Sequence, residues 1–183
     1  MWPLGHAAVG YLCYSILSRS LFDRRLSGLG VIVVLIASQI PDLVDKPLAW
    51  YLTVLPTGRS LAHSLVVLLP LAIAGYLLAR YLRWGAVGGA FGVGILAHTL
   101  TDAMPALWGD ANVSYLFWPL LPVVPYDEGP PTIVGLLLQS LGEPYFYLEF
   151  VLAGVALLLW RADGYPGLYT SLSVAYKKFF NGG

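Results

Sequence analysis

Long apolar segments recur along this chain, and they limit what it can fold into. A helix that crosses a bilayer needs about 20 mainly apolar residues, and the chain alternates such segments with charged or proline-rich turns. Hydrophobic residues make up 58% of the 183 positions, charged residues only 11%, and the mean hydropathy is +0.73. A water-soluble core of this size could not bury so much apolar surface. We therefore predict an all-α fold, a polytopic transmembrane helical bundle that forms a single integral membrane domain over residues 1–183.

The apolar segments predict about five membrane spans. They lie at about residues 4–22, 26–44, 61–82, 85–104 and 145–160. Residues 105–141 carry several prolines, which remove backbone donors and disfavour a continuous helix, so we interpret this stretch as an interfacial or re-entrant loop with a short helix over about 132–141. Glycines of the fourth span, between residues 85 and 94, include two small-x-x-x-small pairs. This spacing predicts that a neighbouring helix backbone approaches closely and that the span is central.

Basic residues predict the orientation of the bundle, because cytoplasmic loops are enriched in Lys and Arg. They cluster after the first span, after the third span and in the tail, at Arg19, Arg24, Arg25, Arg80, Arg83, Arg161, Lys177 and Lys178. The opposite side carries only Lys46 and Arg59. We expect a multi-pass protein of the plasma or inner cell membrane, with the N-terminus outside and residues 161–183 as a cytoplasmic tail.

Charge and cysteine content exclude two classes of function. The formal net charge of +0 argues against a nucleic-acid partner, because such proteins normally carry clustered excess Lys and Arg. Cys13 is the only cysteine, so an intrachain disulfide and a thiolate zinc cluster are both excluded. Any metal site must therefore use nitrogen and oxygen ligands.

Histidines and aspartates gather at the predicted outer ends of the spans. Ionisable side chains are costly in lipid and usually face the bundle interior, a water-filled cavity or one another. His98 and Asp102 are spaced i, i+4 and so share one helix face. The candidate metal ligands are His6, Asp42, His63, His98 and Asp102. Neutral imidazole and carboxylate suit zinc, manganese or iron; we expect one or two divalent ions, zinc first.

Other interpretations of these residues stay open. A single histidine in a membrane helix is more often a packing residue than a ligand, and an aspartate at a helix end is usually only solvated. Buried acids and histidines also mark proton and ion relays, so an ion-coupled or proton-coupled transporter is an alternative. A second alternative is a non-catalytic membrane scaffold in which the metal braces the helices, as coordinatively closed sites do.

Four short sequence elements carry a resemblance to a family. They are Gly5-His6, the segment Pro41 to Lys46, the segment Gly58 to Ser64, and the segment His98 to Asp102. In order and spacing they resemble the membrane-bound metal-dependent hydrolases of bacteria and archaea, over about the first 105 residues, and more distantly the zinc-dependent phospholipases C.

The resemblance implies a set of ligands. Asp42, His63, His98 and Asp102 would hold one metal, and Asp102 would bridge to a second metal held by His6. The phospholipases add His and Glu ligands further downstream, whereas no histidine follows His98 in this chain. A complete three-metal cluster is therefore not expected.

The chemistry that we expect is hydrolysis of a phosphoester or lipid-like ester by a metal-activated water at the outer membrane interface. Asp45 is the candidate general base or outer-shell carboxylate. Arg59 and Lys46 are candidates for holding an anionic phosphate, although headgroup anchoring explains them equally well. The expected partners are membrane lipids and a lipid or phosphoester substrate.

Three weaker features complete the candidate site. Ser64 either donates a hydrogen bond to substrate or caps its helix. The aromatic loop from Trp108 to Tyr126 forms a lid or a substrate wall in this hypothesis. Glu149 lies inside the last predicted span and is the most interesting of the remaining acids.

Overall fold

Helices make up all the regular structure in the described part of the chain. The computed structural model describes residues 1–22, 26–109, 112–125 and 131–168. Within these ranges no strand occurs, which confirms the predicted all-α fold. Part of the predicted charge asymmetry rests on Arg24, Arg25, Lys177 and Lys178, which lie outside the described residues. The orientation and the five spans stay predictions.

The helices follow local sequence signals. The described α-helices are α1 (Pro3–Phe22), α2 (Gly28–Ala37), α3 (Ile40–Trp50), α4 (Leu65–Tyr81), α5 (Gly85–Ala103), α6 (Ile133–Ser140) and α7 (Pro144–Ala162), and two short 3₁₀ helices, η1 (Met104–Trp108) and η2 (Ser114–Phe117), lie between α5 and α6. Ser27, Ser64 and Thr132 cap α2, α4 and α6, each with a side-chain oxygen that accepts from a backbone N–H of the first turn. The predicted bounds of the first, fourth and fifth spans agree with those of α1, α5 and α7, respectively. The short helix predicted near 132–141 corresponds to α6.

Two of the predicted spans differ from the structure. The span expected at 26–44 is interrupted, because α2 ends at Ala37 and α3 begins at Ile40. Pro41 lies in the first turn of α3 and has no N–H with which to continue the hydrogen-bond ladder of α2. The span expected at 61–82 begins later, at Leu65, so residues 61–64 belong to the preceding loop.

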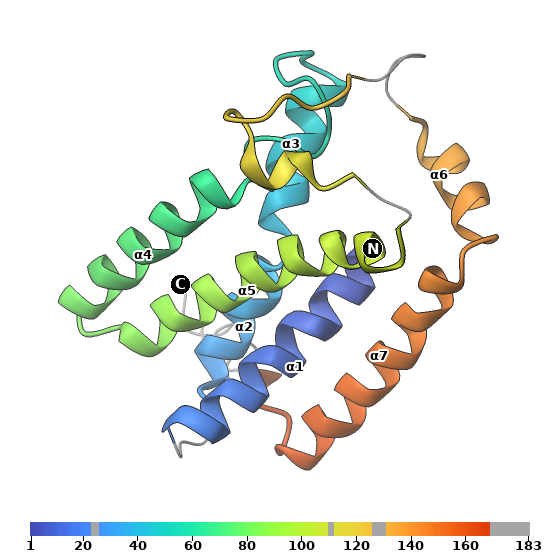
Figure 1. The fold of residues 1–183 in the computed structure, drawn as a ribbon. Helices are drawn as coiled ribbons and strands as arrows, with labels where there is room; N and C mark the ends of the chain where they lie inside the picture. The colour runs from blue at the N-terminus through green and yellow to red at the C-terminus, as the bar shows by residue number, and fades with distance from the viewer. Residues whose placement is uncertain (23–25, 110–111, 126–130, 169–183) are drawn as a thin grey trace, which may run out of the picture.

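The α5 helix is central, as its glycines predict. It packs against α1, α2 and α4, and α7 packs along α1 (Figure 1). A Cβ atom added at Gly94 would lie 2.7 Å from the Ala37 Cβ and 2.8 Å from the Val34 carbonyl oxygen. Gly88 is equally close to α4, with 2.6 Å to the Ala79 Cβ. Only glycine allows these backbones to approach so closely.

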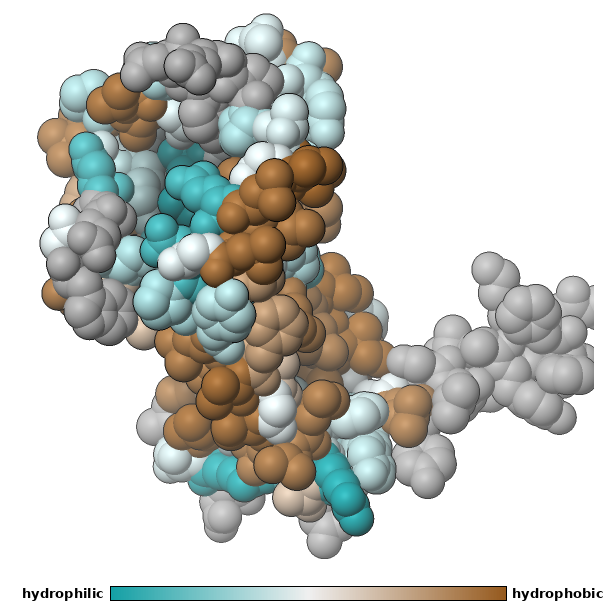
Figure 2. Space-filling view, turned by 90° about the vertical axis from the view of Figure 1, so that its right-hand side faces the viewer, coloured by the Kyte–Doolittle hydropathy of each residue, from teal (hydrophilic) through white to brown (hydrophobic). Residues whose placement is uncertain are grey.

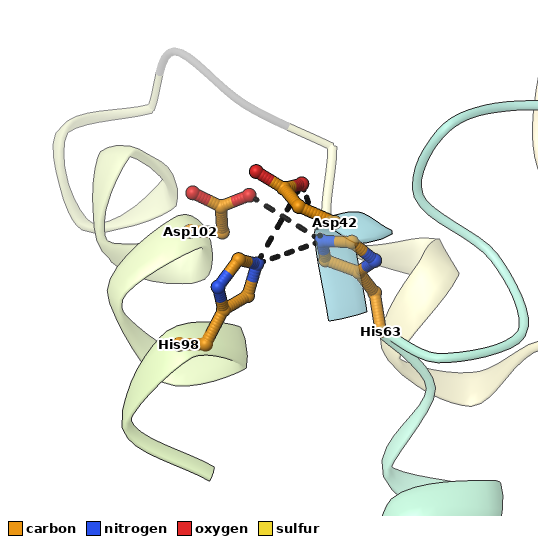
Figure 3. Close-up of side chains that lie close together, drawn as sticks. All are labelled: Asp42, His63, His98 and Asp102. Atoms are coloured by element: carbon orange, nitrogen blue, oxygen red, sulfur yellow. Dashed lines mark hydrogen bonds and ion pairs between the residues drawn. The ribbon is translucent and has the colours of Figure 1, made fainter. Parts of the chain in front are cut away.

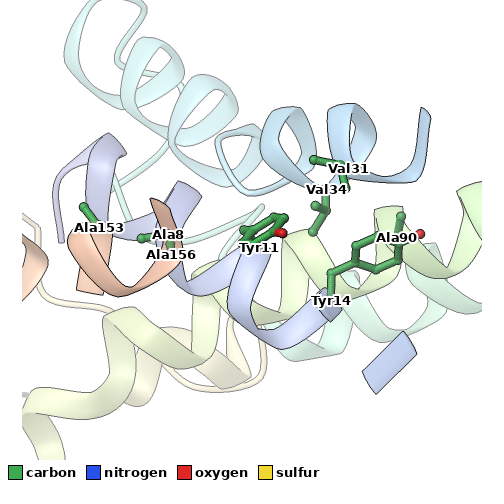
Figure 4. Packing of buried hydrophobic residues seen from close by; sticks show 8 residues of the cluster. All are labelled: Ala8, Tyr11, Tyr14, Val31, Val34, Ala90, Ala153 and Ala156. Carbon is green, nitrogen blue, oxygen red and sulfur yellow. The ribbon is translucent and has the colours of Figure 1, made fainter. Parts of the chain in front are cut away.

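Many large apolar side chains lie on the outside of the bundle, whereas its interior combines small and polar side chains with a smaller number of large apolar ones. The cluster of buried hydrophobic residues in Figure 4 consists of Ala8, Tyr11, Tyr14, Val31, Val34, Ala90, Ala153 and Ala156. By contrast, many leucines and valines of α4 and α7 are exposed. Figure 2 shows hydrophobic side chains over much of one face, with hydrophilic ones in a recessed patch and at the lower end. Small residues at helix contacts are typical of helices that pack in lipid.

Among the described residues, two helical segments are long and apolar enough to cross a bilayer. They are Gly28–Trp50, with 23 residues and a mean hydropathy of 1.7, and Pro144–Ala162, with 19 residues and a mean hydropathy of 1.5. The first of these includes the turn between α2 and α3. The α4 helix is apolar but shorter. Length and composition thus agree with a membrane protein.

Candidate metal centre

Four predicted ligands converge from three parts of the fold. Asp42 comes from the first turn of α3, His63 from the loop before α4, and His98 and Asp102 from the last turns of α5 (Figure 3). Each offers one ligand atom, and these atoms all lie within 4.8 Å of one another. Both histidines are 0% exposed and Asp102 is 3% exposed. We call these four residues the tetrad.

Four of the six distances between ligand atoms of the tetrad are close to those around a tetrahedral ion. His63 Nε2 lies 3.1 Å from His98 Nε2, 3.5 Å from Asp42 Oδ1 and 3.7 Å from Asp102 Oδ2. His98 Nε2 lies 3.7 Å from Asp42 Oδ1. Metal–ligand bonds of about 2.0–2.1 Å place tetrahedral ligands roughly 3.3–3.4 Å apart. Shifts of a few tenths of an ångström would bring these four distances to that value, and the other two pairs of ligand atoms lie within 4.8 Å.

Hydrogen bonds on the far side of each imidazole ring determine which nitrogen faces the tetrad. His63 Nδ1 lies 2.8 Å from Asp45 Oδ2, and His98 Nδ1 lies 2.7 Å from the Ser38 carbonyl oxygen. Both of these oxygens are acceptors, so each Nδ1 carries a proton and each Nε2 presents a lone pair in the neutral ring. Asp42 Oδ1 is also buried and accepts no hydrogen bond. Two lone pairs and an orphaned carboxylate oxygen therefore point at one another, which is the donor set that a cation requires.

The electrostatic surroundings of His63 also favour a positive charge at this point. Burial lowers the pKa of His63, but its contacts with Asp42 and Asp45 raise it by more, so that the net shift is upward. Either a proton on His63 or a metal ion bound beside it would supply the positive charge that these carboxylates favour. The donor set thus fits the divalent ion that the sequence predicts.

Asp45 lies behind His63 and orients its ring. Its carboxylate is 0% exposed and accepts from three donors, namely His63 Nδ1 and the backbone N–H groups of Ser60 at 2.9 Å and Ala62 at 2.8 Å. Of the two roles predicted for Asp45, this geometry matches the outer-shell carboxylate. Such partners fix the ring and raise the basicity of a metal-ligating histidine.

His6 lies beside the tetrad. Its ring stacks on His98 with centroids 3.7 Å apart, and its Nε2 lies 3.4 Å from Asp102 Oδ1. Its Nδ1 is buried without a hydrogen-bond partner. On α7, Glu149 is 2% exposed and accepts from the backbone N–H of Trp2 at 2.8 Å. This carboxylate thereby holds the start of α1, the helix that carries His6. The absence of a side chain at Gly5 leaves room for Glu149, because a Cβ atom added at Gly5 would lie 2.9 Å from Glu149 Cγ.

Two cationic side chains pair with the aspartates of the tetrad, and the amino group of Met1 also lies 2.8 Å from Asp102 Oδ1. Lys46 Nζ lies 2.5 Å from Asp42 Oδ2, one helical turn away on α3. Arg59, in the loop before α4, donates from Nε to Asp102 Oδ2 at 2.9 Å. The side chains of Lys46 and Arg59 are 31% and 48% exposed. The tetrad therefore reaches the surface on the side where these cations lie.

Tyr115, in η2, is a residue of the site that sequence reasoning did not single out. Its ring meets His63 edge-on, with centroids 6.2 Å apart and an interplanar angle of 80°. Burial raises the pKa of Tyr115 to about 12 although Arg59 opposes this shift, so the hydroxyl is protonated at neutral pH. Ser64 caps α4 and also donates to the Trp118 carbonyl oxygen at 2.5 Å. The helix-capping role predicted for Ser64 is confirmed, and its hydroxyl also holds the loop that carries Tyr115.

Comparison with known proteins supports a membrane assignment. The family described as YdjM inner membrane protein matches residues 1–167, and the chain belongs to this family. No curated protein and no solved structure matches the chain. The family match agrees with the expected membrane location and adds nothing on hydrolase activity.

Proposed function

We propose that this member of the YdjM family is a membrane-embedded metal-dependent hydrolase. The observation that supports the proposal most strongly is the convergence of two imidazole lone pairs and two carboxylates in one buried tetrad. Asp42, His63, His98 and Asp102 would hold one zinc ion. His6, which lies against Asp102, would stabilise that carboxylate or share it with a second ion.

The residues around the tetrad have distinct tasks in this proposal. A bound zinc ion supplies an activated water and polarises the ester. Asp45 keeps His63 in the tautomer that a ligand requires. Arg59 uses Nε for Asp102, and the terminal groups of its guanidinium suit two oxygens of a phosphate. Lys46 adds a second positive charge on the exposed side.

The substrate that we propose is a phosphoester or lipid-like ester at the outer membrane interface. The two cations attract an anionic group to the exposed side of the tetrad. Large exposed apolar side chains of α4 and α7 indicate that the surrounding surface contacts lipid. An amphiphile would satisfy both environments at once.

A non-catalytic metal brace is the second candidate, because the tetrad offers four protein ligands. Four protein ligands are typical of structural zinc sites, whereas catalytic sites usually keep one position for water. The half-exposed Arg59 and the partly exposed Lys46 favour the catalytic alternative, because a structural site has no need of accessible cations. Binding of a small external ligand to the metal distinguishes the two.

The decisive experiment compares purified wild-type protein with His63→Ala and His98→Ala variants in detergent. We expect about one zinc ion per wild-type chain by elemental analysis, much less in either variant, and hydrolysis of lipid phosphomonoesters or phosphodiesters by the wild type only. Equal zinc in all three proteins would refute the site. Zinc that binds without hydrolysis, and that takes up no azide or phosphate, would establish the brace instead. The Tm of metal-free wild type and metal-free variants controls for misfolding.

A further inference from the structure

Tyr115 presents a buried hydroxyl that pairs with no group of the described residues. The residue is 6% exposed, and its hydroxyl oxygen is buried without a hydrogen-bond partner. Buried polar groups almost always find a partner, so an orphaned one requires an explanation. A ligand that enters the site is one explanation, because the hydroxyl then has a partner only when the ligand is bound.

The hydroxyl is placed beside the groups that would hold such a ligand. The ring of Tyr115 packs edge-on against His63 of the tetrad. Besides burial, which raises it, two charged groups shift the pKa of Tyr115: Arg59 lowers it and Asp102 raises it, and Arg59 donates to Asp102. We therefore expect an oxygen that binds at the metal beside His63 to meet this donor.

The loop that carries Tyr115 is held in position with respect to the tetrad. Ser64, the residue next to His63, donates to the Trp118 carbonyl oxygen at 2.5 Å. The bond joins the segment of η2 directly to the segment that supplies a ligand. The hydroxyl is thus preorganised, which is what an enzyme requires of a donor that stabilises developing charge.

We propose that the Tyr115 hydroxyl is a catalytic hydrogen-bond donor that, together with Arg59, binds a phosphoryl oxygen of the substrate. The inference rests on the proposed function, because it requires a metal-loaded hydrolytic site. A phenol O–H is neutral, so it can donate without adding to the charge of the pocket. The bond strengthens as negative charge grows on the oxygen in the transition state. Tyr115 therefore selects phosphate esters over neutral esters.

A matched tyrosine exists elsewhere in the bundle. Tyr11 is 3% exposed, and its hydroxyl donates to Asp163 Oδ2 at 2.5 Å. Replacement of Tyr11 by Phe removes a donor that has a partner, whereas the same change at Tyr115 removes a donor that has none. Tyr11→Phe should therefore lower the Tm, and Tyr115→Phe should leave the Tm unchanged or raise it.

The test uses the full chain in detergent, loaded with Co²⁺, and inorganic phosphate as the probe. The visible absorption of the cobalt centre reports phosphate binding in the wild type, Tyr115→Phe and Tyr11→Phe. We expect equal cobalt content in all three proteins and phosphate affinity about 10-fold weaker in Tyr115→Phe only. Hydrolysis of a phosphomonoester lipid should lose about 10²–10³ in kcat in that variant, as for other oxyanion donors.

Each outcome separates this inference from the proposed function. Wild-type protein that binds no cobalt would refute the proposed function. Cobalt-loaded wild-type protein whose visible absorption does not change on addition of phosphate would refute the anion site. A further outcome is that the wild type binds phosphate and hydrolyses the phosphomonoester lipid while Tyr115→Phe has a phosphate affinity and a kcat within about twofold of the wild-type values, a change well below the loss expected for an oxyanion donor. In that case only the proposed role of Tyr115 is refuted. A Tm of Tyr115→Phe as low as that of Tyr11→Phe would show a structural hydroxyl and overturn the inference.

Discussion

The α1 helix contributes to two buried polar clusters, and these clusters differ in how fully they are satisfied. Toward its C-terminal end, Tyr11, Ser15 and Arg19 all direct donors at the Asp163 carboxylate. At its N-terminal end, His6 joins the tetrad. Among the described residues, the buried side-chain atoms without a partner are His6 Nδ1, Asp42 Oδ1 and the Tyr115 hydroxyl oxygen. The cluster at Asp163 is closed, whereas the cluster at the tetrad keeps bonding capacity for a ligand.

This difference separates a polar cluster that stabilises a fold from one that binds something. Leaving a buried polar atom unpaired is costly, so the cost at the tetrad needs a compensating gain. In the proposed function, a metal ion and an anionic substrate would supply that gain. The comparison leads to the following expectations, in order of decreasing effect.

Removal of a tetrad ligand should have the largest effect. His98→Ala deletes one of the two Nε2 atoms that lie 3.1 Å apart, and we expect zinc affinity and hydrolysis to fall by more than about 100-fold, because loss of an outer-shell partner alone typically costs 10–100-fold. Zinc titration with a competing chelator measures the change. Unaltered zinc affinity would mean that both clusters of α1 are structural.

Replacement of the carboxylate behind His63 should have the next largest effect. Asp45→Asn keeps the size of the side chain but replaces one acceptor oxygen by an NH₂ group, although both oxygens accept from backbone or ring N–H groups. We expect zinc affinity to fall by about 10–100-fold, with the zinc stoichiometry restored at saturating metal. The same competition titration measures it, and a variant with wild-type affinity would contradict the outer-shell role.

A change in helix packing should have a smaller effect on the tetrad. Gly94→Ala forces α5 away from α2, because the new Cβ would lie 2.7 Å from the Ala37 Cβ. We expect a loss of about 1–3 kcal/mol of stability and weaker zinc binding, since His98 is one turn further along. Gly89→Ala is the control, because a Cβ at Gly89 would meet nothing within 4 Å. Thermal unfolding in detergent compares the two, and equal Tm values would contradict the close approach.

A change at the closed cluster should have the smallest effect and none on the metal. Asp163→Asn removes the charge opposite Arg19, whose side chain is 50% exposed, so we expect only about 1 kcal/mol of lost stability. Zinc content should equal that of the wild type. If Asp163→Asn lowered zinc binding as much as Asp45→Asn does, the two clusters would not be independent.

The helices and the ligand residues could largely be predicted from the sequence. In an apolar chain, each helix end is marked by a charge, a proline or a capping residue, and each His or Asp at one level of the bundle stands out. The i, i+4 spacing of His98 and Asp102 places them on one face of α5. Periodicity alone therefore brings these residues close to their observed positions.

The remaining features depend on loop paths that no periodicity describes. Asp45 meets His63 only because residues 51–64 turn back along α3. The break after Ala37 exposes the Ser38 carbonyl to His98, whereas the sequence predicted one uninterrupted span at about 26–44. Tyr115 is one of 12 tyrosines, and nothing in the sequence distinguishes it from the others in its aromatic loop.

The supports of the tetrad are mostly main-chain atoms, and this has a consequence for how the site can change. His98 donates to the Ser38 carbonyl, Asp45 accepts from two backbone N–H groups, and Ser64 donates to the Trp118 carbonyl. A bond to the main chain does not depend on which side chain the partner carries. The side chains of the surrounding loops can therefore vary while these bonds keep the ligands in place, so that, under the proposed function, the same ligand arrangement would accommodate different substrates.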